Sequence, residues 1–148
     1  MLLTKDRTTA KLSDFGASIR MMSMSHASAT ENGKQITFQY TPPELLSPDG
    51  RPSFASDVYS TGMVLYELLT GTPPYTGVGL FNVGSKIQKG ELPPFPQVEG
   101  GEFESACSLW KTMVKYEPVE RATLDLVISE TEKRIAQLNE ASESDSVD

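Results

Sequence analysis

The residues best suited to chemistry in this chain are the tripeptide Asp14-Phe15-Gly16, near its start. A carboxylate is the kind of oxygen ligand that Mg²⁺ prefers, and a nearby glycine leaves the backbone free to change conformation. The same tripeptide also fits an ordinary turn that an aspartate opens and a glycine ends. The only histidine, His26, has no acidic or cysteine partner at ligand spacing, so we expect no metal or catalytic role for it.

Further motifs follow Asp14 in a definite order. Residues 36–44 read Ile-Thr-Phe-Gln-Tyr-Thr-Pro-Pro-Glu, and the final glutamate lies 30 positions after Asp14. Residues 57–62 read Asp-Val-Tyr-Ser-Thr-Gly, residues 71–75 read Gly-Thr-Pro-Pro-Tyr, and residues 117–121 read Glu-Pro-Val-Glu-Arg. A single short motif arises easily by chance, but an ordered set along most of a chain does not.

This order and spacing resembles the C-terminal lobe of eukaryotic protein kinases of the serine/threonine or tyrosine-kinase-like type. The resemblance implies ATP- and Mg²⁺-dependent phosphorylation of proteins, and Thr37 with residues 71–75 favours serine or threonine as the acceptor. It further implies that Asp14 binds the Mg²⁺ that bridges the ATP phosphates. Phe15 would then fix the direction of that carboxylate, and Gly16 would act with it as the hinge of the segment that follows.

The resemblance places an activation segment over residues 14–44. Thr37 would lie beside the catalytic aspartate, and Tyr40 would shape the pocket for the substrate residue after the phosphoacceptor. Ile36 stands where the family usually has glycine, and Pro42 stands where alanine is common. Phosphorylation orders such loops through arginine pairing, so we expect a phosphosite among the hydroxyl residues between the two motifs: Ser23, Ser25, Ser28 and Thr30.

Four residues receive structural roles from the resemblance. Pro43 belongs to the end of the activation segment, and Glu44 is expected to form a buried ion pair with the distant Arg121. The other reading of this pair is two unrelated surface charges. Asp57 in kinases accepts backbone hydrogen bonds from the catalytic loop, although an acid in the first turn of any helix is also favourable.

The family's catalytic loop, with its aspartate and asparagine, would precede Met1, because residues 1–3 look like the apolar strand that follows it. We therefore expect no glycine-rich loop, no ATP-anchoring lysine and no complete catalytic set within these 148 residues. Positioning supplies nearly all of phosphoryl-transfer catalysis, so the chain alone should be inactive. The alternative is a non-catalytic, kinase-like interaction or scaffold module.

The hydrophobic pattern predicts the elements that position these residues in a mainly α fold. Residues 1–3 and 10–12 should form a short hairpin, and residues 16–35 lack periodicity and should form a long loop. Helices are expected over residues 57–70, 80–89, 103–114 and 124–138.

The helix over 57–70 is apolar nearly all round, which predicts central burial. Ser53 or Ser56 should cap it, and Gly71 should end it. In kinases another helix from ahead of the catalytic loop packs on it, so part of its apolar surface should be bare here.

Composition limits the setting and the partners. The net charge is −7, which argues against nucleic acid and leaves a protein substrate or a partner kinase as the expected partner. The single cysteine and the lack of a signal peptide or long apolar run favour a cytoplasmic or nuclear location without membrane insertion. We expect the partial kinase domain to span residues 1–138, followed by an acidic, disordered tail over 139–148.

Overall fold

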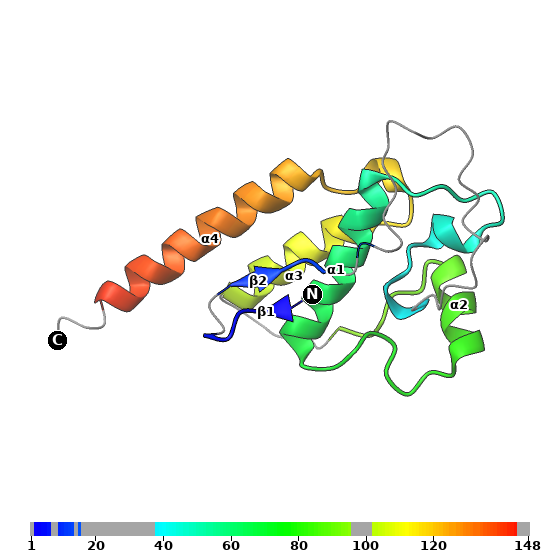
Figure 1. The fold of residues 1–148 in the computed structure, drawn as a ribbon, viewed down its shortest axis with the longest axis horizontal. Helices are drawn as coiled ribbons and strands as arrows, with labels where there is room; N and C mark the ends of the chain where they lie inside the picture. Colours follow the sequence, from blue (N-terminus) through cyan, green and yellow to red (C-terminus); the bar gives the residue numbers. More distant parts are fainter. Residues whose placement is uncertain (1, 7–8, 14, 16–37, 96–101, 145–148) are drawn as a thin grey trace.

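The computed structural model describes residues 2–6, 9–13, 15, 38–95 and 102–144 (Figure 1). The described part is mainly helical, as the sequence predicts, with a two-stranded hairpin before the helices. The expected loop over residues 16–35 lies outside the described residues, as do Asp14, Gly16 and Thr37. Among the residues that are described, no helix is both long and apolar enough to cross a membrane.

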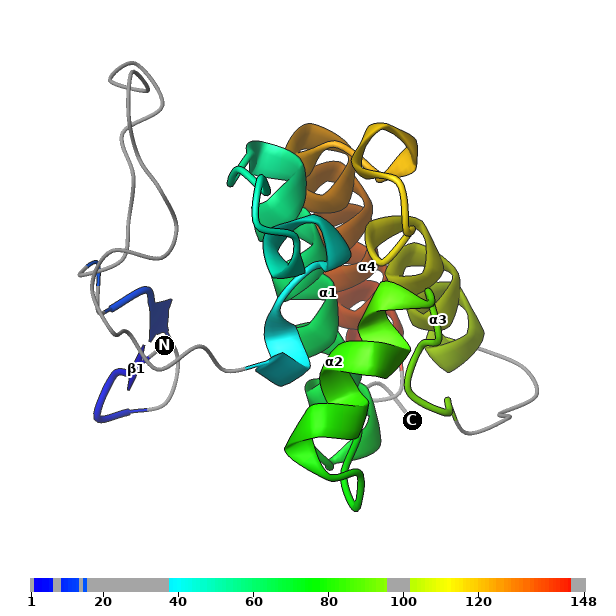
Figure 2. The ribbon, with the colours of Figure 1, turned by 90° about the vertical axis from the view of Figure 1, so that its right-hand side faces the viewer.

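The hairpin pairs strand β1 (Leu2–Leu3) with strand β2 (Ala10–Lys11) in antiparallel register, Leu2 opposite Lys11 and Leu3 opposite Ala10. The backbone N–H of Thr4 donates to the carbonyl of Thr9 over 2.9 Å and continues the pairing toward the turn. The hairpin lies to one side of the helices (Figure 2). The predicted strand pair is therefore confirmed.

Helix α1 (Phe54–Thr70) is the element on which the rest of the fold is assembled. Ser53 caps it in a capping box with Ser56, whose backbone N–H donates to the Ser53 hydroxyl over 3.2 Å. Gly71 ends the helix in the left-handed conformation, at a φ of 68°. Both predicted boundary signals are confirmed, and the helix begins three residues before the expected Asp57 because Ser53 rather than Ser56 is the cap.

Burial of α1 differs between its faces. Val58, Tyr59 and Met63 are almost completely buried, whereas the side chain of Leu68 is 69% exposed. The prediction of a helix buried all round is therefore wrong for one face, and the prediction of a bare apolar surface agrees with the exposure of Leu68. One face of the helix packs into the core, whereas another faces solvent.

Three further helices follow α1 in the chain. Helix α2 (Leu80–Gln88) and helix α3 (Glu102–Met113) match the predicted ranges to within one residue at each end, and α3 packs directly on α1. Short 3-10 turns η3 (Phe38–Tyr40) and η4 (Pro43–Leu46) precede α1, and η5 (Pro118–Glu120) precedes the last helix. These turns bring residues 38–46 and 118–120 against the central helix.

Helix α4 (Leu124–Ser144) begins at the cap that Thr123 provides to the N–H of Leu126, and it projects away from the other helices (Figure 1). It extends past residue 138 into the stretch expected to be a disordered tail. The correction has a local cause, because Glu140, Ala141 and Glu143 are residues that sustain a helix. Composition alone led to the expectation of disorder there.

The core consists of side chains from α1, α2, α3 and the segments that join them. They are Val58, Tyr59, Met63, Tyr66, Tyr75, Val83, Ile87, Trp110, Met113, Val114 and Ala122. Gly62 allows α1 and α3 to approach, since a Cβ there would lie 2.7 Å from Cγ1 of Val114. This close approach of α1 to Met113 and Val114 therefore depends on a residue without a side chain.

Candidate functional site

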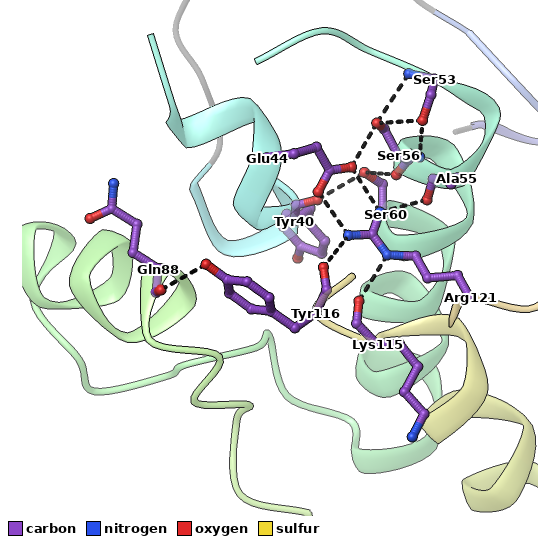
Figure 3. Close-up of polar contacts among 10 residues, drawn as sticks. All are labelled: Tyr40, Glu44, Ser53, Ala55, Ser56, Ser60, Gln88, Lys115, Tyr116 and Arg121. Atoms are coloured by element: carbon purple, nitrogen blue, oxygen red, sulfur yellow. Dashed lines mark hydrogen bonds and ion pairs between the residues drawn. The ribbon is translucent and has the colours of Figure 1, made fainter. Parts of the chain in front are cut away.

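The structure brings Glu44 and Arg121 together although 77 positions separate them in the chain. Nη1 of Arg121 lies 2.8 Å from Oε1 of Glu44, and Nη2 lies 2.7 Å from Oε2 (Figure 3). Two parallel N–H···O bonds of this kind give geometric specificity as well as energy. The guanidinium side chain is fully buried and the carboxylate side chain is 19% exposed, so water screens this pair less than a surface pair.

Every donor of Arg121 has an acceptor. A guanidinium carries five N–H groups, and Glu44 takes two of them. The other three donate to backbone carbonyls: Nε to Lys115 over 2.8 Å, Nη1 to Ala55 over 2.8 Å and Nη2 to Tyr116 over 3.0 Å. The guanidinium also lies over the ring of Tyr59, 5.0 Å from its centroid. Arg121 thus joins η4, α1 and the end of α3 at one point.

The carboxylate of Glu44 is held ionised by its neighbours. Burial raises its pKa, but the hydrogen bonds from Arg121 and Ser56, the backbone hydrogen bond and the Arg121 charge outweigh burial, so the pKa lies below its ordinary value. Ser56 contributes through its hydroxyl, which donates to Oε1 over 2.8 Å. The end of the predicted activation segment is therefore tied to the first turn of α1 as well as to Arg121.

Tyr40 is fixed by a second set of contacts. Its hydroxyl donates to Oε2 of Glu67 over 2.6 Å, and its carbonyl accepts a hydrogen bond from Ser60 over 2.9 Å. Burial, the hydrogen bond to Glu67 and the charge of Glu67 raise the pKa of Tyr40 to about 12. Tyr40 therefore stays protonated near neutral pH and attaches residues 38–40 along the length of α1.

Pro43 and Asp57 differ in their surroundings. Pro43 is buried as the first residue of η4, next to Glu44. Asp57 lies in the first turn of α1 with an exposed side chain, and its carboxylate has no hydrogen-bond partner within the described ranges. Its position there is favourable against the helix dipole. The role expected for Asp57 toward the catalytic loop stays a prediction.

The predicted metal and hinge residues are only partly within the described chain. Phe15 is described and its side chain is 66% exposed, whereas Asp14 and Gly16 lie outside the described residues. The same holds for Thr37 and for the candidate phosphosites Ser23, Ser25, Ser28 and Thr30. Within the described residues, no group of three or more His, Cys, Asp or Glu side chains could hold a metal ion. Metal binding by Asp14 stays a prediction.

Sequence reasoning missed three residues of this site. Ser56 was considered only as a helix cap, yet its hydroxyl reaches Glu44. Ser60 bonds the carbonyl of Tyr40, and a Cβ on Gly50 would overlap the carbonyl oxygen of Glu44. The spacing of the two serines, four positions apart on one helix face, was a usable signal. The close approach at Gly50 had none, because a glycine after Pro-Asp looks like any turn.

Comparison with known proteins assigns the family. A family model for protein tyrosine and serine/threonine kinases matches residues 1–130. The serine/threonine-protein kinase RUNKEL of Arabidopsis thaliana is 33% identical over 120 residues, which make up 81% of this chain and 8% of that protein. The serine/threonine-protein kinase PknB of Mycobacterium tuberculosis is 36% identical over 107 residues, or 71% of this chain and 17% of that protein.

A third relative, the serine/threonine-protein kinase ppk11 of Schizosaccharomyces pombe, is 32% identical over 129 residues. These residues are 84% of this chain and 38% of that protein. The chain therefore spans well under half the length of each of these relatives. Because the family model covers most of the 148 residues, this chain belongs to the protein tyrosine and serine/threonine kinase family.

Proposed function

We propose that these residues form the substrate-side part of a serine/threonine protein kinase, in which they hold the end of the activation segment in place. The observation that carries the proposal is the group of hydrogen bonds made by Arg121. They join Glu44 to α1 and to the segment just after α3. Such a joint prevents the segment before Glu44 from drifting relative to the helices. The three relatives described above are named serine/threonine-protein kinases, which supports serine or threonine as the acceptor.

Two residues of the segment are proposed to face the substrate. Tyr40 has its backbone bonded to Ser60 and its ring oxygen bonded to Glu67, so its position is set by α1. Thr37 precedes this anchored part by three positions and would lie beside the catalytic aspartate. The phosphoacceptor side chain of a protein substrate would then lie against residues 37–40. Fixed geometry of this kind is what phosphoryl transfer requires.

Asp14 is the proposed magnesium ligand of this chain, with Phe15 and Gly16 as the hinge beside it. Mg²⁺ and ATP, when bound, would supply the charge neutralisation and the transferred phosphoryl group. Of the family's catalytic groups, the 148-residue sequence offers Asp14 alone. We therefore propose that the chain by itself transfers no phosphate.

The test is a transfer assay with the purified 148-residue chain. Mixed with labelled ATP, Mg²⁺ and a general protein substrate, it should incorporate no more label than its Asp14→Ala variant. Incorporation that depends on Mg²⁺ and disappears in Asp14→Ala would contradict the proposed inactivity. A longer in-frame product that begins upstream of Met1 should phosphorylate serine or threonine and lose this activity on Asp14→Ala.

One of Ser23, Ser25, Ser28 and Thr30 is proposed as a regulatory phosphosite. Arg20 and Lys11 are the local cations that could pair with the added phosphate. Limited proteolysis would compare a variant with all four residues changed to alanine and one with all four changed to glutamate. Slower cleavage between residues 16 and 37 in the glutamate variant supports the switch, and equal rates contradict it.

A non-catalytic interaction module is the second candidate, and exposed apolar side chains favour it. Phe81 on α2 is 99% exposed, and Phe54 and Leu68 on α1 are exposed by about two thirds. Exposed apolar surface of sufficient area marks protein contact sites. The reading frame upstream of Met1 separates the two candidates: an in-frame His-Arg-Asp followed by the terminal asparagine supports the kinase, and a stop codon behind a functional promoter supports the module.

A further inference from the structure

A hollow of about 450 Å³ lies between α1, the segment after α2, and α3. It adjoins the Arg121 contacts, because Tyr59, Lys115 and Tyr116 take part in both. Its walls are largely aromatic: Tyr59, Phe95, Trp110 and Tyr116 line it. Tyr116 is held in place by a hydrogen bond from its hydroxyl to the carbonyl of Gln88 over 3.1 Å (Figure 3). This volume falls in the range of small-molecule sites.

Two cations line the same hollow. Lys111 and Lys115 lie one turn apart on and just after α3. Both side chains are exposed, and neither ammonium forms an ion pair with a carboxylate in the described part of the chain. The side chain of Lys115 extends away from Glu44 and Arg121, while its carbonyl is the group bonded to Arg121 (Figure 3). The rim of an aromatic hollow thus carries positive charge in a chain whose net charge is −7.

Trp110 is the most buried of the four aromatic residues that line the hollow, apart from Tyr59. The residue is 3% exposed, and its indole Nε1 is a buried donor that has no hydrogen-bond acceptor among the described residues. Its ring lies 4.8 Å from the ring of Phe95 and 5.8 Å from that of Tyr66, measured between centroids. Leaving such a donor unpaired is unfavourable, and native structures usually pair it. Because protein atoms cover Nε1, a ligand in the hollow would meet the ring of Trp110 rather than its N–H.

We propose that this hollow binds a small aromatic carboxylate. The aromatic side chains, Trp110 among them, would contact the ring of the ligand, and the ammonium groups of Lys111 and Lys115 would attract its charge. Each feature selects a different part of the same ligand. The hollow shares Tyr59, Lys115 and Tyr116 with the contacts of Arg121. Ligand binding there is measured without phosphoryl transfer, so either proposal can fail without the other.

The test uses the fact that Trp110 is the only tryptophan of the chain, so its indole N–H gives a single proton resonance. The ¹⁵N-labelled 148-residue chain is titrated with 3-phenylpropionate, with 3-phenylpropanol and with 3-phenylpropylamine. These probes share one ring and differ in terminal charge. We expect 3-phenylpropionate to shift the indole resonance saturably with a millimolar Kd, as is usual for a ligand of this size. The alcohol should bind about fivefold more weakly, and the amine should cause no saturable shift.

Charge variants complete the test. Lys111→Gln and Lys115→Gln should each weaken 3-phenylpropionate binding about two- to fivefold and leave the alcohol unaffected. Lys133→Gln on α4 removes the same charge outside the hollow and should change neither Kd. The proposal is overturned if 3-phenylpropionate causes no saturable shift, if the amine binds as well as the carboxylate, or if Lys133→Gln has the same effect as the two hollow variants.

Discussion

Arg121 and Trp110 are two buried residues that pack near α1, and they differ in how their polar atoms are satisfied. Arg121 is 6% exposed and all five of its N–H groups have acceptors, whereas Trp110 is 3% exposed and its side-chain N–H has no acceptor in the described part of the chain. A buried polar group with all its hydrogen bonds stabilises the fold, whereas a buried donor without an acceptor lowers its stability. The comparison separates a structural joint from a candidate binding site.

The largest expected effect comes from Arg121→Ala, which removes the ion pair with Glu44 and the hydrogen bonds of the guanidinium. This change leaves the Glu44 carboxylate without its buried partner, and such losses typically cost about 3–5 kcal/mol in the free energy of unfolding. Urea unfolding followed by Trp110 fluorescence measures it. Lys133→Ala, which removes an exposed cation bonded to Glu130, should change the free energy by less than about 1 kcal/mol. Equal losses in the two variants would contradict the assigned role of Arg121.

Both regions depend on the close approach of α1 and α3, which Gly62→Ala would disturb. The new Cβ would lie 2.7 Å from Cγ1 of Val114 and 3.1 Å from Cβ of Met113. Overpacking of this kind costs about 1–3 kcal/mol, measured by the same urea titration. Gly84→Ala is the matched control, because Gly84 lies inside α2 with nothing within 4 Å of its new Cβ. That variant should be stabilised by roughly 0.5–1 kcal/mol, through helix propensity.

Acid should weaken the ion pair between Glu44 and Arg121. The pKa of Glu44 is lower in the folded chain than its ordinary value of 4.5, so the folded state holds its proton less tightly than the unfolded state. The contribution of Glu44 is therefore fully present above the unfolded pKa and is lost as the pH falls through the folded pKa. The difference in free energy of unfolding between the wild-type chain and Glu44→Gln should shrink as the pH is lowered below 4.5. A difference that stays constant from pH 7 to pH 3 would show that the carboxylate gains nothing from Arg121.

The smallest effect is expected for Trp110→Phe, which keeps an aromatic ring and removes the unmatched donor. Loss of packing and relief of the unpaired N–H act in opposite directions, so the free energy of unfolding should change by less than about 1.5 kcal/mol. Urea unfolding followed by far-ultraviolet circular dichroism measures the change. A loss as large as that of Arg121→Ala would mean that the indole N–H has a hydrogen-bond acceptor in solution. The two residues would then no longer differ in this respect.

Local signals in the sequence were sufficient for the helices. Ser53 and Gly71 mark the ends of α1 because capping and the left-handed conformation depend on a few adjacent residues. The end of α4 was missed, since an acidic and serine-rich composition was taken to exclude a helix that residues 139–144 nevertheless form. The exposed face of α1 could not be located from its pattern, because a helix apolar nearly all round does not indicate which face has a partner.

The sequence by itself determined the family and the identity of the pair Glu44 and Arg121, since ordered motifs and their residue types survive without coordinates. Only the tertiary structure decided how that pair is satisfied: three of the five donors of Arg121 go to the carbonyls of Ala55, Lys115 and Tyr116. Every residue has a backbone carbonyl, so no residue type marks those acceptors. The unmatched N–H of Trp110 has the same origin, because whether a donor finds an acceptor depends on how distant segments pack.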